Sequence, residues 1–128
     1  MATLNLKAEI TSTDLTSDAL LAAVTKSATV SEGGIQRVNV TANSGGSPAT
    51  LITAASYTPT ATKSCYVYLK NAHPSTKLRF KLLGGGTTED EISLSAGQWC
   101  LFPWAAATDI TVYAGNNLGT LCEFGVFI

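Results

Sequence analysis

The chain has few charged residues. Only 13% of its 128 residues are Asp, Glu, Lys or Arg, which is about half the share of an ordinary globular protein. The net charge of −1 gives no overall attraction toward nucleic acid or an anionic membrane. A surface this poor in charge is unusual for a free monomer. Burial between subunits would account for it, so we expect an oligomer.

Residues that carry chemistry are also scarce. His73 is the one histidine, and the three cysteines, Cys65, Cys100 and Cys122, lie far apart with no C-x-x-C pair. A zinc site or disulfide framework is therefore not expected, and we interpret the thiols as free and buried. His73 precedes Pro74 in a polar turn without a triad context, so we predict no enzyme, no catalytic residue and no metal.

Long apolar runs are absent as well. Polar residues interrupt every apolar stretch, so none has the length of a bilayer span or the apolar region of a secretory signal. We therefore expect no membrane partner and a protein made and kept, at least initially, in the cytoplasm.

Two short runs suggest ligand-binding loops but lack the complete pattern. The three glycines at 84–86 are not followed by the lysine and helix of a phosphate-binding loop. The acidic run at 89–91 does not have the alternate spacing and the glycine of a calcium loop. We interpret the glycine run as a flexible hairpin loop and the acidic run as a solvated loop, and we predict no cofactor.

Both tryptophans lie in one apolar segment, residues 98–104, which we interpret as a central strand. Side chains alternate between the two faces of a strand, so Trp99 points away from the face that carries Phe102 and Trp104. These aromatics therefore predict two buried layers, one of them closed by a loop or a neighbouring chain. At least one tryptophan should lie in the core, while a sugar-stacking platform and a subunit contact stay open as alternatives.

Alternation of apolar and polar residues predicts strands along most of the chain. It is clear at residues 3–10, 65–70 and 77–83. The apolar residues 124–128 would aggregate unless they were paired inside a sheet. Gly, Pro and Asn turns separate the segments at intervals of roughly ten residues. This pattern predicts an all-β fold, an antiparallel β-sandwich or jelly roll of eight or nine short strands.

The N-terminal part allows two interpretations. Ser17 and Asp18 before an Ala/Leu run are typical of a capped helical turn near residues 15–21, whereas period-two spacing favours a strand at 22–31. Glycines at 33 and 34 predict a tight hairpin turn at 32–34. We expect a single β domain over residues 1–128, in which residues 1–21 could form a docking arm ahead of the sandwich core.

A set of cations offers a second candidate surface. If residues 65–70 and 77–83 form a hairpin, one outward face carries Tyr66, Tyr68, Lys70, Lys77, Arg79 and Lys81. The simplest interpretation is an ordinary exposed sheet face. The alternatives are a protein contact and, less favoured, single-stranded nucleic acid. The same face could also meet the acidic run at 89–91 between copies of the chain.

Several short motifs together resemble small virion structural proteins of tailed bacteriophages, notably marine and cyanobacterial ones. They span residues 30 to 128 and read Glu32-Gly33-Gly34-Ile35, Tyr66-Val67-Tyr68-Leu69-Lys70-Asn71, Gly97-Gln98-Trp99, Phe102-Pro103-Trp104, Asp109-Ile110 and Glu123-Phe124-Gly125-Val126-Phe127. The resemblance implies a β-sandwich or jelly-roll module that forms trimers on the virion. It implies no catalysis.

The leading hypothesis is therefore a capsid cement or decoration protein, a homotrimer bound to the major capsid protein on the virion surface. The competing hypothesis is a tail or fibre module that binds host surface glycans through exposed aromatics. In either case the candidate contact residues are Trp99, Phe102, Trp104, Tyr66, Tyr68, Lys70, Lys77, Arg79 and Lys81. Nucleic acid is not an expected partner.

Overall fold

The computed structural model describes residues 2–13, 20–42, 47–57, 65–82, 91–115 and 119–128. The chain divides into two compact units, Met1–Glu32 and Gly33–Ile128. The boundary therefore falls after Glu32, later than the arm of residues 1–21 expected from the sequence. The first unit extends further because the strand expected at 22–31 pairs within it.

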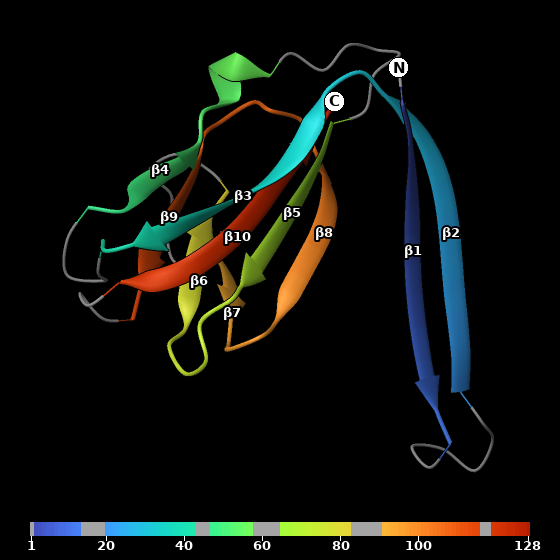
Figure 1. The fold of residues 1–128 in the computed structure, drawn as a ribbon, viewed down its shortest axis with the longest axis horizontal. Helices are drawn as coiled ribbons and strands as arrows, with labels where there is room; N and C mark the ends of the chain where they lie inside the picture. The colour runs from blue at the N-terminus through green and yellow to red at the C-terminus, as the bar shows by residue number, and fades with distance from the viewer. Residues whose placement is uncertain (1, 14–19, 43–46, 58–64, 83–90, 116–118) are drawn as a thin grey trace. The chain divides into compact units, whose positions relative to one another are not determined.

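The second unit contains the sandwich (Figure 1). Its elements are β3 (Gly33–Val40), β4 (Ala49–Ile52), the 3-10 helix η1 (Ala54–Ser56), β5 (Cys65–Asn71), β6 (Leu78–Lys81), β7 (Glu91–Leu94), β8 (Trp99–Trp104), β9 (Ile110–Ala114) and β10 (Thr120–Phe127). The strands form two four-stranded sheets, ordered β3-β10-β5-β8 and β4-β9-β6-β7. We call them the aromatic sheet and the β4 sheet.

The strand pairing identifies the fold as a jelly roll. The first strand of the unit pairs with the last, β3 with β10, and the next pairs are β4 with β9, β5 with β8, and β6 with β7. All of these pairs are antiparallel. Such nested pairing, wound over into two facing sheets, is the jelly-roll arrangement of eight strands. The predicted all-β antiparallel sandwich is confirmed.

The core lies between the two sheets, where each contributes alternate residues of its strands. Its largest fully buried apolar side chains are Phe80, Leu69, Leu78, Ile110, Val67 and Val112. The three thiols face the same interior: Cys65 and Cys122 are buried and Cys100 is half-buried, all of them free. Burial raises the pKa of each thiol, that of Cys122 to about 12.

The aromatic strand β8 has the predicted alternation. Phe102 and Trp104 pack against the core, whereas Trp99 pairs with Lys70 on the outer face and is 56% exposed. The prediction that this strand is central is wrong, because β8 lies at the edge of its sheet. Pro103 explains the position, since proline has no N–H for a second neighbour and is found on edge strands.

The central position belongs instead to the C-terminal strand. β10 pairs on one side with β3 and on the other with β5. The prediction that the apolar C-terminal segment is paired inside a sheet is confirmed for residues 124–127, because Phe124 through Phe127 all have partners on both sides, while Ile128 follows the strand. The apolar C-terminal segment thus holds the sheet together.

The hairpin expected from residues 65–70 and 77–83 does not form. β5 belongs to the aromatic sheet and β6 to the β4 sheet, so their connection crosses between layers. Asn71, at the end of β5, redirects the chain there. Its buried Nδ2 donates to the carbonyl oxygens of Thr76 and Leu94 at 2.6 and 2.9 Å, and its Oδ1 accepts from the His73 N–H at 3.0 Å.

The glycines at 33 and 34 do not form the predicted tight turn. They open strand β3, and neither has positive φ. Close packing explains glycine at 33, because a Cβ there would lie 2.5 Å from Cδ1 of Phe127. A Cβ at Gly125 would likewise meet the Phe127 ring at 3.2 Å. The Phe127 ring therefore packs against the backbone of two strands.

The first unit is a β-hairpin of two equal strands. β1 (Ala2–Ser12) pairs antiparallel with β2 (Leu20–Val30), from Ala2 opposite Val30 to Ser12 opposite Leu20. The expected helical turn at 15–21 falls largely outside the described residues, while Leu20 and Leu21 are in the strand. One face of the hairpin is almost wholly apolar and carries Ala2, Leu4, Leu6, Ala8, Ile10, Ala22, Val24, Ala28 and Val30, with Lys26 among them.

The close packing around Gly125 gives a direct test of the sheet. Gly125→Ala should lower the free energy of unfolding by about 1–3 kcal/mol, because the new Cβ would lie 2.8 Å from the Gly34 carbonyl oxygen. Gly34→Ala is the matched control, since nothing lies within 4 Å of a Cβ there. Chemical denaturation measures both. Equal stability of the two variants would contradict this packing.

Candidate functional site

The cations predicted to share one face are divided between the two faces of the sandwich. Tyr66, Tyr68 and Lys70 alternate with the core residues of β5 and face outward from the aromatic sheet. Tyr68 and Lys70 are half-buried, whereas Tyr66 is buried, with 5% of its surface exposed. Arg79 and Lys81 alternate with the buried residues of β6 and face outward from the β4 sheet. The predicted single basic face is therefore wrong, because β5 and β6 are not neighbours.

Lys77 lies exposed just before β6, and its carbonyl oxygen accepts a 3.0 Å hydrogen bond from the Gly115 N–H. Phe102 and Trp104 face the core, and the Trp104 ring meets that of Tyr57 edge to face at 6.1 Å. Of the predicted contact residues, the structure thus groups Tyr66, Tyr68, Lys70 and Trp99 on one outer face.

This outer face of the aromatic sheet is rich in apolar and aromatic groups. Strand register places Ile35, Gly125, Tyr68 and Leu101 in one row across the four strands, and Gly33, Phe127, Tyr66 and Pro103 in the next. Ile35 is 59% exposed, and the Trp99 ring lies 6.5 Å from that of Tyr68. An outward sheet face with this composition is suited to a contact with another surface.

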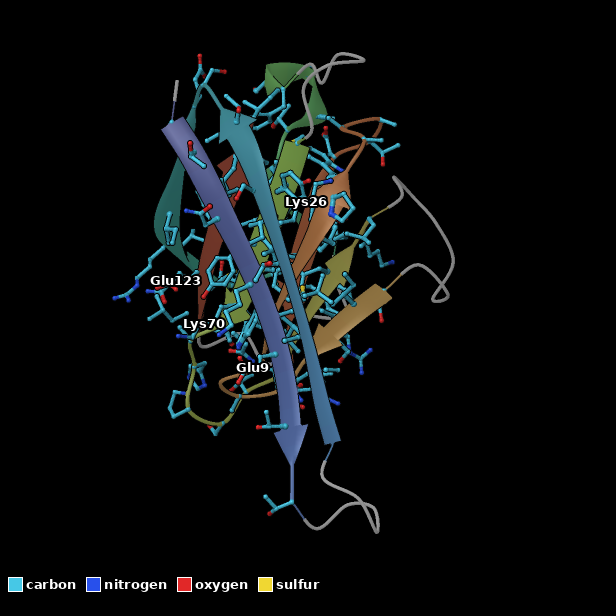
Figure 2. All side chains as sticks on the ribbon, turned by 90° about the vertical axis from the view of Figure 1, so that its right-hand side faces the viewer. Glu9, Lys26, Lys70 and Glu123 are labelled. Atoms are coloured by element: carbon cyan, nitrogen blue, oxygen red, sulfur yellow. The ribbon has the colours of Figure 1, made fainter. Side chains whose placement is uncertain are left out.

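A third row crosses the same face and carries charge. Arg37, Glu123, Lys70 and Trp99 lie opposite one another on β3, β10, β5 and β8, and Figure 2 labels Lys70 and Glu123 on the neighbouring central strands. The Arg37 Nε donates to Glu123 Oε2 at 2.8 Å, and the Tyr68 hydroxyl donates to Oε1 at 3.1 Å. Both carboxylate oxygens therefore have donors.

The hydrogen bond from Arg37 is the main cause that lowers the pKa of Glu123, with further contributions from Tyr68 and from the positive charge of Lys70. Burial raises the pKa of Tyr68, and its bond to Glu123 adds to the shift. The phenol is therefore a donor and the carboxylate an acceptor at neutral pH. The cluster fixes the orientation of Tyr68 beside Trp99.

Charged groups on the β4 sheet are paired within the chain. Tyr113 donates a hydrogen bond to Glu91, and the Arg79 Nη1 lies 3.9 Å from Glu91 Oε2. The Arg79 and Lys81 side chains each lie 5.8 Å from the centre of the Tyr113 ring. These cations therefore cover Tyr113. Of the acidic run at 89–91, Glu91 serves an intramolecular pair, and the other two residues are outside the described part of the chain.

A shallow depression lies at the corner after β5, lined by Lys70, Asn71, Ala72, His73, Pro74, Ala96 and Gly97. Its polar groups have structural uses. The His73 Nδ1 accepts from the Ser75 and Thr76 N–H groups at 3.2 and 3.0 Å, as expected of a turn histidine. Sequence reasoning missed Asn71, although an Asn at the end of a buried strand before a polar turn is a usable signal.

The hairpin offers a second apolar surface. Ile10 and Val24 on its apolar face are 63% and 69% exposed. The opposite face is mainly polar, with Ala23 opposite Glu9, and it includes the exposed ion pair of Lys7 with Glu9 at 2.8 Å. At about 3.3 Å per residue, each strand spans about 36 Å. The hairpin thus presents a long, one-sided apolar strip.

Within the described residues, no group of three or more His, Cys, Asp or Glu side chains is placed to hold a metal ion. None of the helices in that part of the chain has the length and apolar character needed to cross a membrane.

Comparison with known proteins gives little. No protein-family model matches the chain, and no curated protein matches it. A solved structure from Bacillus endospore appendages, described as a novel family of disulfide-linked pili, is similar over 75% of this chain and 83% of its own. The sequence identity is 19% and the TM-score 0.43, values at which the likeness supports no inference about function.

The Glu123 cluster predicts a pH dependence of stability. The pKa of Glu123 is lowered in the folded state. The ionised carboxylate therefore contributes fully to the stability of the folded protein above the ordinary pKa of glutamate, and this contribution is lost as the pH falls through the lowered pKa. Glu123→Gln should therefore be less stable than the wild type at neutral pH, and the difference should shrink on acidification. Urea unfolding at a series of pH values measures it.

The exposed Glu32 provides the control for this comparison, since Glu32→Gln should change stability little at any pH. A wild-type minus Glu123→Gln difference that stays constant from neutral to acidic pH would contradict the assignment of the charge-assisted bonds to Glu123.

Proposed function

We propose that the protein is a virion structural protein of a tailed bacteriophage, a capsid cement or decoration protein. In this proposal it is made in the host cytoplasm, forms a homotrimer and binds the major capsid protein on the outside of the head shell. It stabilises the shell by burying its own surface at contacts between subunits. The observation that carries the proposal is the amphipathic hairpin of β1 and β2, joined to a separate jelly roll.

The hairpin has the features of a docking arm. An isolated two-stranded hairpin is at best marginally stable in water, and a third strand or a packed face is needed to support it. Its exposed apolar residues, with Ile10 and Val24 at 63% and 69% exposure, supply such a face. Full burial of one such side chain stabilises a contact by up to about 1.5–3 kcal/mol. Docking would therefore support the hairpin and the contact together.

Because many copies would bind one shell, a modest free energy for each contact is sufficient to stabilise the particle. About 3 kcal/mol per site raises the occupied fraction relative to the empty one by roughly a hundredfold. Contacts on one particle act together, so the effect on shell rupture is multiplied. The jelly roll contributes a rigid body for this purpose, in a fold that viral capsid domains also use. The 13% charge content fits a surface that is largely covered.

The location can be tested by reconstruction of the purified virus particle. We expect density for a jelly roll of this 13.3 kDa chain on the head shell, with the hairpin strip against coat subunits. Ile10→Asp should then release the protein from particles, because it places a charge in the apolar strip. The control Thr11→Asp, on the polar face, should leave it bound. Density on the tail alone, or none, would contradict a cement role.

A second candidate function is supported by the exposed aromatics of the outer face. Trp99 is 56% exposed and lies 6.5 Å from Tyr68, and Tyr68 is held by Glu123. Flat apolar rings beside hydrogen-bonding groups suit a sugar ring. As a tail or fibre module, the protein would bind host surface glycans here.

Tryptophan fluorescence distinguishes the two functions. If the outer face binds glycan, host polysaccharide should shift the emission of the wild type and of Trp104→Phe, whose remaining tryptophan is Trp99. The shift should vanish in Trp99→Phe, which keeps only the core-facing Trp104. An emission spectrum unchanged by polysaccharide in the wild type would exclude the glycan-binding function for the ligands tested.

A further inference from the structure

The four edges of the sandwich are not equally protected against pairing with another strand. β4 and β7 have four residues each, and β4 has a register irregularity between Thr50 and Ile52. β8 carries Pro103. Short length, bulges and proline are known ways to block strand addition at an edge. Three of the four edges therefore have a feature that hinders the addition of another strand.

The fourth edge, β3, has none of these protective features. It has eight residues, all paired with β10 in unbroken register from Gly33 to Val40, and contains no proline. Its one charged side chain, Arg37, is bonded to Glu123 within the sheet. A long, regular edge strand of this kind is a template for another strand.

The core is also open beneath this edge. Val38 pairs with the buried Cys122 and so lies on the inner side of the sheet, yet it is 39% exposed. Gln36, on the same side, is exposed too, as are Ala49 and Thr50 in the facing edge strand β4. A strand added next to β3 would therefore extend the core if it carried apolar residues on one face only.

The chain contains strands with that pattern in its own hairpin. β1 and β2 are eleven residues long, longer than β3. β1 places all of its apolar residues on one face, and β2 places most of its apolar residues on the same face of the hairpin. In the described residues they pair only with each other. Adding the hairpin to a four-stranded sheet would give it the third strand that an isolated hairpin lacks.

Within one chain, the simplest way to pair the hairpin with β3 would be a tight turn between β2 and β3, and this turn does not form. Only Ser31 and Glu32 separate β2 from β3, and a two-residue hairpin turn needs positive φ at its first central residue. Neither residue has it, and β2 pairs with β1 instead of β3. A second copy of the chain supplies the same hairpin without this constraint.

We infer that the β1–β2 hairpin of one copy adds to the free edge of β3 in a second copy. Each chain then gives one hairpin and receives one, a head-to-tail contact that closes into a ring when the rotation between copies permits. Main-chain hydrogen bonds supply the pairing, and the apolar strip covers Val38. The inference concerns contacts between copies and stands whether or not the protein sits on a virion.

A complementation experiment on the full-length chain tests donor and acceptor separately. Sedimentation velocity of the wild type at micromolar concentration should give an oligomer. Val38→Lys, which places a charge on the inner side of the receiving edge, and Ile10→Asp, which places one in the donated strip, should each lose it. Mixed at equal concentration, the two variants should recover a complex of one chain of each, because one keeps the hairpin and the other the edge.

Controls use the same charge changes elsewhere. Ala107→Lys in an exposed loop and Thr11→Asp on the polar face of the hairpin should keep the wild-type oligomer. Thermal unfolding of every variant checks that the sandwich is folded.

The other outcomes overturn the inference. A monomeric wild type excludes assembly. An oligomer kept by Ile10→Asp points to pairing of β3 with β3, and one kept by Val38→Lys points to pairing between hairpins. A mixture that stays monomeric excludes donation from one variant to the edge of the other. The apolar strip is used in both proposals, so Ile10→Asp bears on both of them. Val38→Lys leaves the strip intact, so the loss of the oligomer in Val38→Lys tests this inference separately from the proposed contact with coat subunits.

Discussion

The pairing of the last strand with the first strand of the sandwich is the constraint on which the rest of the structure depends. β10 lies between β3 and β5 and bonds to both. Its inner side chains Cys122 and Val126 belong to the core, and its outer Glu123 holds Arg37 and Tyr68. The jelly roll is closed by this strand, and the same strand orients the polar centre of the outer face.

Closure of the roll leaves three features without a structural task inside the sandwich. These are the exposed part of the outer aromatic face, the open edge of β3 and the apolar strip of the hairpin. Each carries large exposed apolar side chains, among them Trp99, Val38 and Ile10. Exposed apolar surface of this extent usually marks interaction sites. The features agree with a protein that works through contacts with other surfaces, in line with the proposed role in a shell.

Local patterning predicted most of the secondary structure. Period-two alternation identified β1, β5 and β6, and it placed Trp99 opposite to Phe102 and Trp104. β10 was predicted because its apolar end would aggregate unless it were paired in a sheet. It failed where neighbours decide the outcome. Which strands pair is a non-local property, so the sequence suggested a β5–β6 hairpin that the buried Asn71 corner prevents. The two glycines at 33 and 34 were predicted to form a turn, because nothing local shows that the Phe127 ring packs over that backbone.

The sequence predicted several of the residue types that form the candidate site, but not which of them share one face of the sandwich. Tyr66, Tyr68 and Lys70 could be grouped because they lie on one strand, whereas Trp99 joins them only through the pairing of β5 with β8. Arg79 and Lys81 were assigned to the wrong face because sheet membership was unknown. Glu123 and Arg37, which organise the outer face, were missed. They lie 86 residues apart, and only the pairing of β3 with β10 brings them together.

The central claim is that this chain assembles through the free edge of β3. Hydrogen exchange of the β3 backbone amides, measured at increasing protein concentration, tests this claim. The amides between Gly33 and Val40 that do not face β10 should exchange rapidly in dilute solution and become protected as the oligomer forms. If those amides stay rapidly exchanging in the fully assembled protein, the edge is free and this account of the assembly is wrong.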